Sequence, residues 1–110
     1  MPAIREYSLG PVSYTLLDAE VAPGTTEQDA LKIQIRMTNN DRRDASLLDK
    51  SFHLLLDGVA VAPDNNLNEL VPAQSVRDGD VLFTIPHGFS DARLKISYLD
   101  EGTEVALILQ

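Results

Sequence analysis

Residues 31–38 read Leu-Lys-Ile-Gln-Ile-Arg-Met-Thr, in which apolar and polar side chains alternate without a break until Asn39-Asn40. Because successive side chains of a β-strand point to opposite faces of a sheet, this stretch has one apolar and one polar face. The run therefore predicts a strand that covers a hydrophobic core on one side and meets water on the other. Such a strand needs neighbours, and the rest of the chain repeats the pattern.

Turn residues divide the chain into a series of short strands. Strands are predicted at residues 4–9, 12–22, 29–38, 51–56, 59–62, 80–86, 93–99 and 103–109. Turns are predicted at Pro23-Gly24, Asp57-Gly58, Asp78-Gly79 and residues 100–102, because Pro presets φ and Gly permits positive φ. Residues 39–49 read as a loop with room for one helical turn. The spacing predicts an all-β fold, an immunoglobulin-like antiparallel β-sandwich of about seven to nine strands.

Composition limits the chain to one domain and narrows its partners. With 110 residues, 44% of them hydrophobic, the chain has material for a single core, which we assign to residues 1–110. The net charge of −8 weighs against nucleic acid and against an anionic membrane surface. The doublet Arg42-Arg43 stands between Asp41 and Asp44, so we expect local neutralisation. The absence of cysteine excludes disulfides and thiolate chemistry.

Membrane insertion and export are separate questions. No stretch approaches the roughly 20 apolar residues of a membrane span, so we expect no membrane insertion. Residues 1–7 show no basic-then-apolar signal pattern. The sequence by itself therefore leaves a cytoplasmic location and an exported one both open.

The order of several short motifs resembles a known family. The segments are Gly10-Pro11-Val12-Ser13-Tyr14-Thr15-Leu16, residues 31–39, Ser51-Phe52-His53-Leu54 followed by Asp57-Gly58, residues 70–75, residues 79–86, and Arg93-Leu94-Lys95-Ile96. Together they resemble the DUF4352 family of telokin-like, MPT63-like bacterial immunoglobulin-fold domains. Ala73 departs from the pattern, since the family has Gly after this Pro. The resemblance implies an extracytoplasmic domain, secreted, periplasmic or surface-anchored, and it does not imply an enzyme.

Three leucines in loop regions are candidates for contact with a protein partner. Leu47, Leu48 and Leu67 stand in polar surroundings, and exposed apolar side chains often anchor a partner. The alternative is that they close the open end of the sandwich, since apolar side chains near a surface are common. Our first hypothesis is a non-enzymatic binding or accessory module whose protein partner is unidentified.

The acidic loops offer a rival hypothesis, a small-ligand or calcium-binding domain. Calcium takes several oxygen ligands, and the candidates are Asp57, Asp64, Asn66, Asp78 and Asp80. None matches the spacing of an EF-hand. The alternative is structural, because Asp and Asn are also the usual residues of turns.

Catalysis has little support in the sequence. His53 lies between Phe52 and Leu54, so on a strand it points away from the apolar face. His87 stands near Ser90 and Asp91, but a catalytic triad is defined by geometry, and the chain lacks a nucleophile-elbow motif. Neither histidine has a second His or Cys at ligand spacing, so zinc is not expected. We expect no enzyme and no required cofactor.

Overall fold

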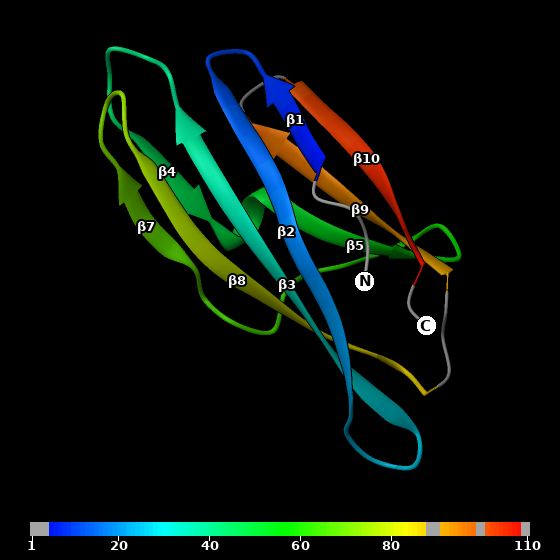
Figure 1. Cartoon of the computed structure of the whole chain (residues 1–110). Coiled ribbons are helices and arrows are strands. Elements are labelled where there is room, and N and C mark those ends of the chain that lie inside the picture. Colours follow the sequence, from blue (N-terminus) through cyan, green and yellow to red (C-terminus); the bar gives the residue numbers. More distant parts are fainter. Residues whose placement is uncertain (1–4, 88–90, 99–100, 109–110) are drawn as a thin grey trace.

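The protein is an antiparallel β-sandwich, as the alternation predicts (Figure 1). The structure, a computed structural model, describes residues 5–87, 91–98 and 101–108, and only the backbone of residues 5, 91 and 108. Sheet I has the order β1-β2-β3-β8, sheet II the order β10-β9-β5-β6, and β4 pairs with β7. The bounds are β1 Arg5–Leu9, β2 Val12–Pro23, β3 Gln28–Asn39, β4 Ala45–Leu48, β5 Phe52–Leu56, β6 Val59–Val61, β7 Asn68–Val71, β8 Val76–Pro86, β9 Asp91–Tyr98 and β10 Glu101–Ile108.

Strand β3 is the centre of sheet I and confirms the opening prediction. Its odd-numbered side chains from Asp29 to Asn39 are buried, while most of the even-numbered ones are exposed. It pairs with β2 on one side and with β8 on the other, along nearly its whole length. The mixed pattern of β2 has a local cause, a register shift between Leu16 and Asp18. This bulge turns the later even-numbered side chains of β2 to the outer face, beside those of β3.

The core lies between the two sheets and is mostly aliphatic. Tyr14 of β2 and Phe52 of β5 join the sheets through an edge-to-face contact, with ring centroids 5.5 Å apart and planes at 87°. Both rings are fully buried. Among the described residues, the Tyr14 hydroxyl makes no hydrogen bond of standard geometry. Burial raises the pKa of Tyr14 to about 12, and the nearby Ser51 hydroxyl opposes that shift in part.

Two strands were missed by sequence reasoning, and they pair with each other. Residues 45–48 form β4, although the stretch 39–49 reads as a loop, and the 3₁₀ turn follows at Asp49–Ser51. Strand β4 pairs with β7 in register, with Ala45 opposite Val71. Each strand has only four residues, too few for a pattern of period two to stand out. The described strands therefore number ten, against the expected seven to nine.

The predicted turns have mixed outcomes. Asp57 and Gly58 have φ of 51° and 81° and connect the paired residues Leu56 and Val59, as in the two-residue hairpin turn that the sequence predicts. The turn predicted at Asp78-Gly79 is wrong, because both residues lie within β8, opposite β3. Near the C-terminus, residues 101 and 102 belong to β10. Residues 4, 99, 100 and 109 of the predicted elements lie outside the described residues.

Gly79 does not form a turn; it lies within β8 and leaves space for the side chains of Leu47 and Leu67. A Cβ built on Gly79 would lie 3.0 Å from Leu47 Cδ2 and 3.0 Å from Leu67 Cδ1. Such contacts are tighter than ordinary van der Waals packing, so a larger residue would push these leucines away. A glycine in the middle of β8 thus lets the β4 strand and the 62–67 loop approach sheet I closely.

Asn39 ties together the loops at one end of the sandwich. It is fully buried, and its Nδ2 donates to the carbonyls of Arg43 and Val71 at 2.9 and 3.0 Å. Its Oδ1 accepts a hydrogen bond from the Asp41 N–H at 2.9 Å, and its own N–H donates to the Ser75 carbonyl. The side-chain amide therefore joins the loop that follows β3 to the end of β7, and the main-chain N–H adds the turn at Ser75.

Candidate functional site

The five candidate calcium ligands do not gather into one site. Asp57 lies in the β5–β6 turn and Asn66 at an exposed position of the 62–67 loop, while Asp78 and Asp80 lie on β8. The fifth, Asp64, accepts a hydrogen bond from Thr84 Oγ1 at 2.7 Å. Within the described part of the chain, no group of three or more His, Cys, Asp or Glu side chains could hold a metal ion.

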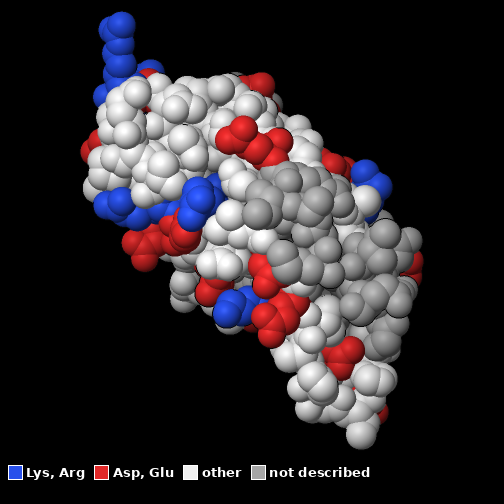
Figure 2. Space-filling model, viewed as in Figure 1, with Lys and Arg blue, Asp and Glu red and all other residues white. Residues whose placement is uncertain are grey.

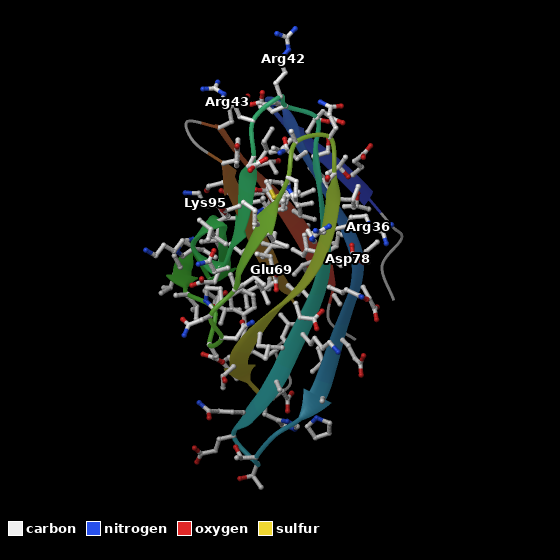
Figure 3. All side chains as sticks on the ribbon, turned by 90° about the vertical axis from the view of Figure 1, so that its left-hand side faces the viewer. Arg36, Arg42, Arg43, Glu69, Asp78 and Lys95 are labelled. Atoms are coloured by element: carbon white, nitrogen blue, oxygen red, sulfur yellow. The ribbon has the colours of Figure 1, made fainter. Side chains whose placement is uncertain are left out.

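Two of these carboxylates are engaged by cations on β3 instead. Asp78 stands opposite Arg36 in register, and the guanidinium donates to both carboxylate oxygens, at 2.8 and 3.2 Å (Figure 3). This forked contact holds the pKa of Asp78 below its ordinary value. Asp80 Oδ2 lies 3.9 Å from Lys32 Nζ. The sequence suggests that Asp78 and Asp80 lie in an acidic loop. In the structure they lie on β8, where their side chains face the cations of β3.

The structure corrects the hypothesis that Leu47 and Leu67 are exposed anchors. Leu47 is fully buried and Leu67 is 8% exposed, and both belong to the hydrophobic core. Leu48 on β4 is half-buried. Leu47 and Leu67 both pack over Gly79. They therefore fit the alternative interpretation, in which these leucines close the end of the sandwich.

The described contacts of the histidines involve other partners than the Ser90 and Asp91 that the sequence suggests. His87 Nδ1 lies 2.9 Å from Asp29 Oδ1, and the His87 N–H donates to the Glu27 carbonyl. Ser90 lies outside the described residues, and only the backbone of Asp91 is described. His53 on β5 is half-buried and stands opposite Lys95 on β9, away from the core-facing Phe52.

The Arg42-Arg43 doublet is not neutralised by its acidic neighbours. The carboxylates of Asp41 and Asp44 instead accept backbone hydrogen bonds, from Arg42 and Ala73 respectively. No ion pair forms between the doublet and a described carboxylate. Both side chains extend outward from the end of the sandwich (Figure 3). Figure 2 shows basic side chains projecting from one end, and acidic and further basic side chains interspersed over the visible face.

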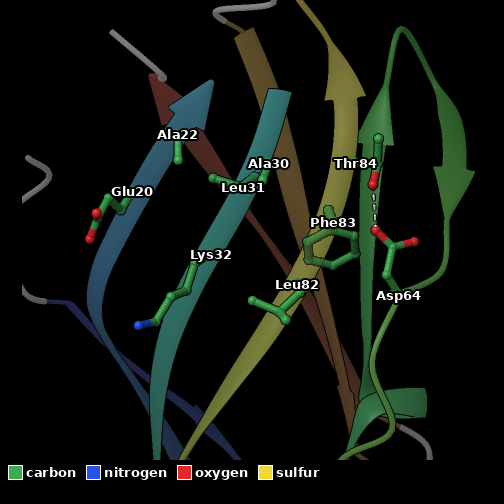
Figure 4. A pocket seen from close by; sticks show the side chains of 9 residues that line it. All are labelled: Glu20, Ala22, Ala30, Leu31, Lys32, Asp64, Leu82, Phe83 and Thr84. Atoms are coloured by element: carbon green, nitrogen blue, oxygen red, sulfur yellow. Dashed lines mark hydrogen bonds between the residues drawn. The ribbon is translucent and has the colours of Figure 1, made fainter. Parts of the chain in front are cut away.

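A hollowed apolar surface lies on the outer face of sheet I. A groove of about 380 Å³, which we call the apolar groove, opens near the β2–β3 hairpin (Figure 4). Ala22 and Ala30 stand opposite each other in register, and Ala30 stands opposite Thr84. Leu82, which is 39% exposed, adds an apolar wall from β8. Because two adjacent strands present alanine at the same level, the sheet surface is hollow there.

The rim of the apolar groove is charged. Its charged side chains are Glu20, Lys32 and Asp64. A second, smaller depression of about 170 Å³, which we call the acidic hollow, is lined by Asp18, Glu20, Lys32 and Gln34. Glu20 and Lys32 belong to both depressions, so the two lie side by side along β2 and β3. Neither Asp18 nor Glu20 forms an ion pair with a described cation.

Sequence reasoning missed the groove residues, and the reason is geometric. Ala22 and Ala30 are eight positions apart in the chain, and their meeting depends on the register of the β2–β3 hairpin. That register follows the bulge at Leu16 and Asp18, which no local pattern reveals. The alternating pattern of β3 could have predicted part of the groove, because it places the side chains of Ala30 and Lys32 on the solvent face.

Comparison with known proteins supports the fold. No protein-family model matches the sequence, and no curated protein matches it. Among solved structures, the chain is similar to "a putative lipoprotein (ycdA)" from Bacillus subtilis, with a TM-score of 0.77 and 13% sequence identity. The alignment covers 97% of this chain and 39% of that protein, so this chain spans about two fifths of its length.

Proposed function

We propose that this chain is a non-enzymatic accessory domain of an exported bacterial protein, and that it binds a protein partner. The observation that supports binding is the outer face of sheet I, where an apolar groove lies beside carboxylates that no described cation neutralises. Apolar surface beside polar groups is typical of interaction sites. The shape shared with a lipoprotein supports an extracytoplasmic location at the cell surface.

Membership of the DUF4352 family is part of this proposal. It is supported by the order of motifs along the chain and by the fold of the lipoprotein neighbour. The residue that departs from the family pattern, Ala73, precedes Gln74, which has a φ of 60°. A Pro-Gly turn would place its glycine one position earlier. In this chain the turn at residues 72–75 has Gln74 at the position of positive φ, and the Ser75 N–H donates to the Pro72 carbonyl.

Affinity capture tests this function directly. The domain is immobilised, and envelope and cytosolic extracts of the source cell are passed over it separately. A second column carries an unrelated domain of equal net charge, which removes proteins held by charge alone. We expect a specific protein retained from the envelope fraction and displaced by the free domain. Retention from neither fraction above the control column would overturn the binding role, and retention from cytosol alone would overturn the location.

A further inference from the structure

We propose that the apolar groove and the acidic hollow together bind an extended, basic segment of a partner protein, with an apolar side chain in the groove and a lysine or arginine in the hollow. This inference rests on the proposed function and names the chemistry of the partner. The register of three strands, the size of the two depressions and the charge around them support it.

The charge of the outer face selects a cationic partner. Outward positions of β2 and β8 carry four carboxylates, Asp18, Glu20, Asp78 and Asp80, against Lys32 and Arg36 on β3. The two cations are engaged by Asp78 and Asp80. Glu20 stands opposite Lys32 but forms no ion pair with it, and Asp18 forms none with a described cation, so both carboxylates can accept an outside cation. The net charge of −8 attracts a basic partner from a distance.

The apolar groove accepts a side chain of moderate size. Its floor of Ala22 and Ala30 leaves room that neighbouring long side chains do not fill, and Leu82 supplies a partly exposed apolar wall. A leucine or valine placed there would cover Leu82, and apolar burial is favourable in proportion to the area removed from water. The hydrogen bond between Asp64 and Thr84 fixes the far side of the groove.

The spacing of the two depressions predicts a sequence pattern in the partner. The groove lies between the cross-strand rows of Ala22 and Glu20, and the hollow lies between the rows of Glu20 and Asp18. Successive outward rows are two residues apart, about 7 Å along a strand. An extended segment lying along β2 and β3 would therefore place the apolar and basic side chains two positions apart.

A short peptide tests this pattern. The probe is Thr-Thr-Leu-Thr-Lys-Thr-Thr with blocked ends, whose threonines favour extended backbone. It is titrated into ¹⁵N-labelled protein while amide chemical shifts are followed. We expect saturable shifts confined to β2, β3 and β8 around the two depressions, with a dissociation constant of about 0.1–1 mM for so small a contact. Peptides with Leu→Ser or Lys→Glu should bind about tenfold more weakly.

Two surface variants and two matched controls locate the site. Ala30→Gln fills the groove, and Glu20→Lys reverses the charge shared by groove and hollow; each should weaken binding about tenfold or more. Ala60→Gln, at an exposed position of β6 in sheet II, and Glu6→Lys, at an exposed position of β1, should leave the affinity unchanged. Glu20→Lys should in turn bind the Lys→Glu peptide better than the original one.

Three results would overturn the inference. The first is the absence of saturable shifts with the original peptide. The second is equal binding of spermidine at the same amides, together with indifference to the Leu→Ser change, which would make the occupant a small cation. The third is a captured envelope protein whose binding Ala30→Gln and Glu20→Lys leave unchanged; in that case the proposed function stands and only this site fails.

Discussion

At the scale of single residues, the buried hydroxyl of Tyr14 makes stability depend on alkaline pH. Its pKa is raised to about 12 in the folded protein, against about 10 in the unfolded chain. Below pH 10 both states hold the proton, so this group contributes no pH dependence. Between pH 10 and 12 the unfolded state releases the proton while the folded state retains it. The free energy of unfolding should therefore fall by about 2–3 kcal/mol over this range.

The matched control for this prediction is Tyr14→Phe, which keeps the edge-to-face contact with Phe52. At neutral pH the variant should change the free energy of unfolding by less than about 1 kcal/mol, because the hydroxyl has no hydrogen bond of standard geometry to lose. Urea unfolding at pH 7, 10 and 11.5 measures both effects. The other two tyrosines are common to both proteins. Equal alkaline losses in the two proteins would contradict the assignment to Tyr14.

Asn39 is the residue whose loss should cost most among the polar side chains described above. Asn39→Asp keeps the shape but replaces the donating Nδ2 by an oxygen facing the carbonyls of Arg43 and Val71. Lost donors and a buried charge should lower the free energy of unfolding by about 2–5 kcal/mol at pH 7. The control is Asn66→Asp at an exposed position of the 62–67 loop, expected within about 0.5 kcal/mol of wild type. Comparable losses in both variants, measured by thermal or urea unfolding, would refute the role of Asn39.

At the scale of elements, the contact of β8 with β4 and the 62–67 loop depends on Gly79. Gly79→Val should displace the Leu47 and Leu67 side chains and destabilise the fold by about 1–3 kcal/mol. Leu67→Ala opens a cavity by itself, but in the double variant the valine occupies part of that space. The two losses should therefore be less than additive, by about 1 kcal/mol in a double-mutant cycle. Strict additivity would show that the two side chains do not share one space.

The elements that could be predicted from the sequence are those with a long, regular pattern. Strand β3 was predicted to within one residue at each end, because unbroken alternation over the eight residues 31–38 leaves one interpretation. Strands β4 and β7 have four residues each and were not predicted. Gly79 was read as a turn because Asp-Gly is also a turn signal, and only the neighbouring leucines reveal its packing role. Leu47 and Leu67 were ambiguous for the same reason, since burial depends on partners distant in sequence.

The candidate site was less predictable than the fold. Acidic residues were noted between positions 57 and 80, but their assignment to loops failed where β8 begins at Val76. On strand β8, Asp78 stands opposite Arg36 and forms an ion pair with it, and Asp80 lies within ion-pair distance of Lys32 on the same face. The groove depends on a cross-strand meeting of two alanines, which a single sequence does not encode as a local pattern.

At the scale of the whole molecule, the net charge of −8 should dominate the response to salt. The three Lys or Arg ion pairs of the described residues are exposed and contribute little. Raising salt from about 10 to about 100 mM shortens the Debye length from about 30 to about 10 Å and screens repulsion across the domain. The melting temperature should therefore rise by about 2–5 °C.

A charge-reduced variant is the control for the salt prediction. Replacing the exposed carboxylates of Glu6 and Glu69 by Gln should raise the melting temperature at low salt and reduce its dependence on salt. Calorimetry of both proteins at the two salt concentrations gives the comparison. A fall in melting temperature with salt would show that the ion pairs outweigh the repulsion.

Strand β8 is the outermost strand of sheet I, and the way its edge is covered affects whether copies of this domain can associate. Asn65 donates from Nδ2 to the Asp80 carbonyl and accepts at Oδ1 from the Leu82 N–H, while the Asp64 N–H donates to the Leu82 carbonyl. One side-chain amide thus imitates the peptide group of a further strand. An open edge is a template on which another chain can polymerise. Resistance to fibril growth at this part of β8 therefore depends on two loop residues, which let copies of the domain be concentrated without pairing their sheets along these positions.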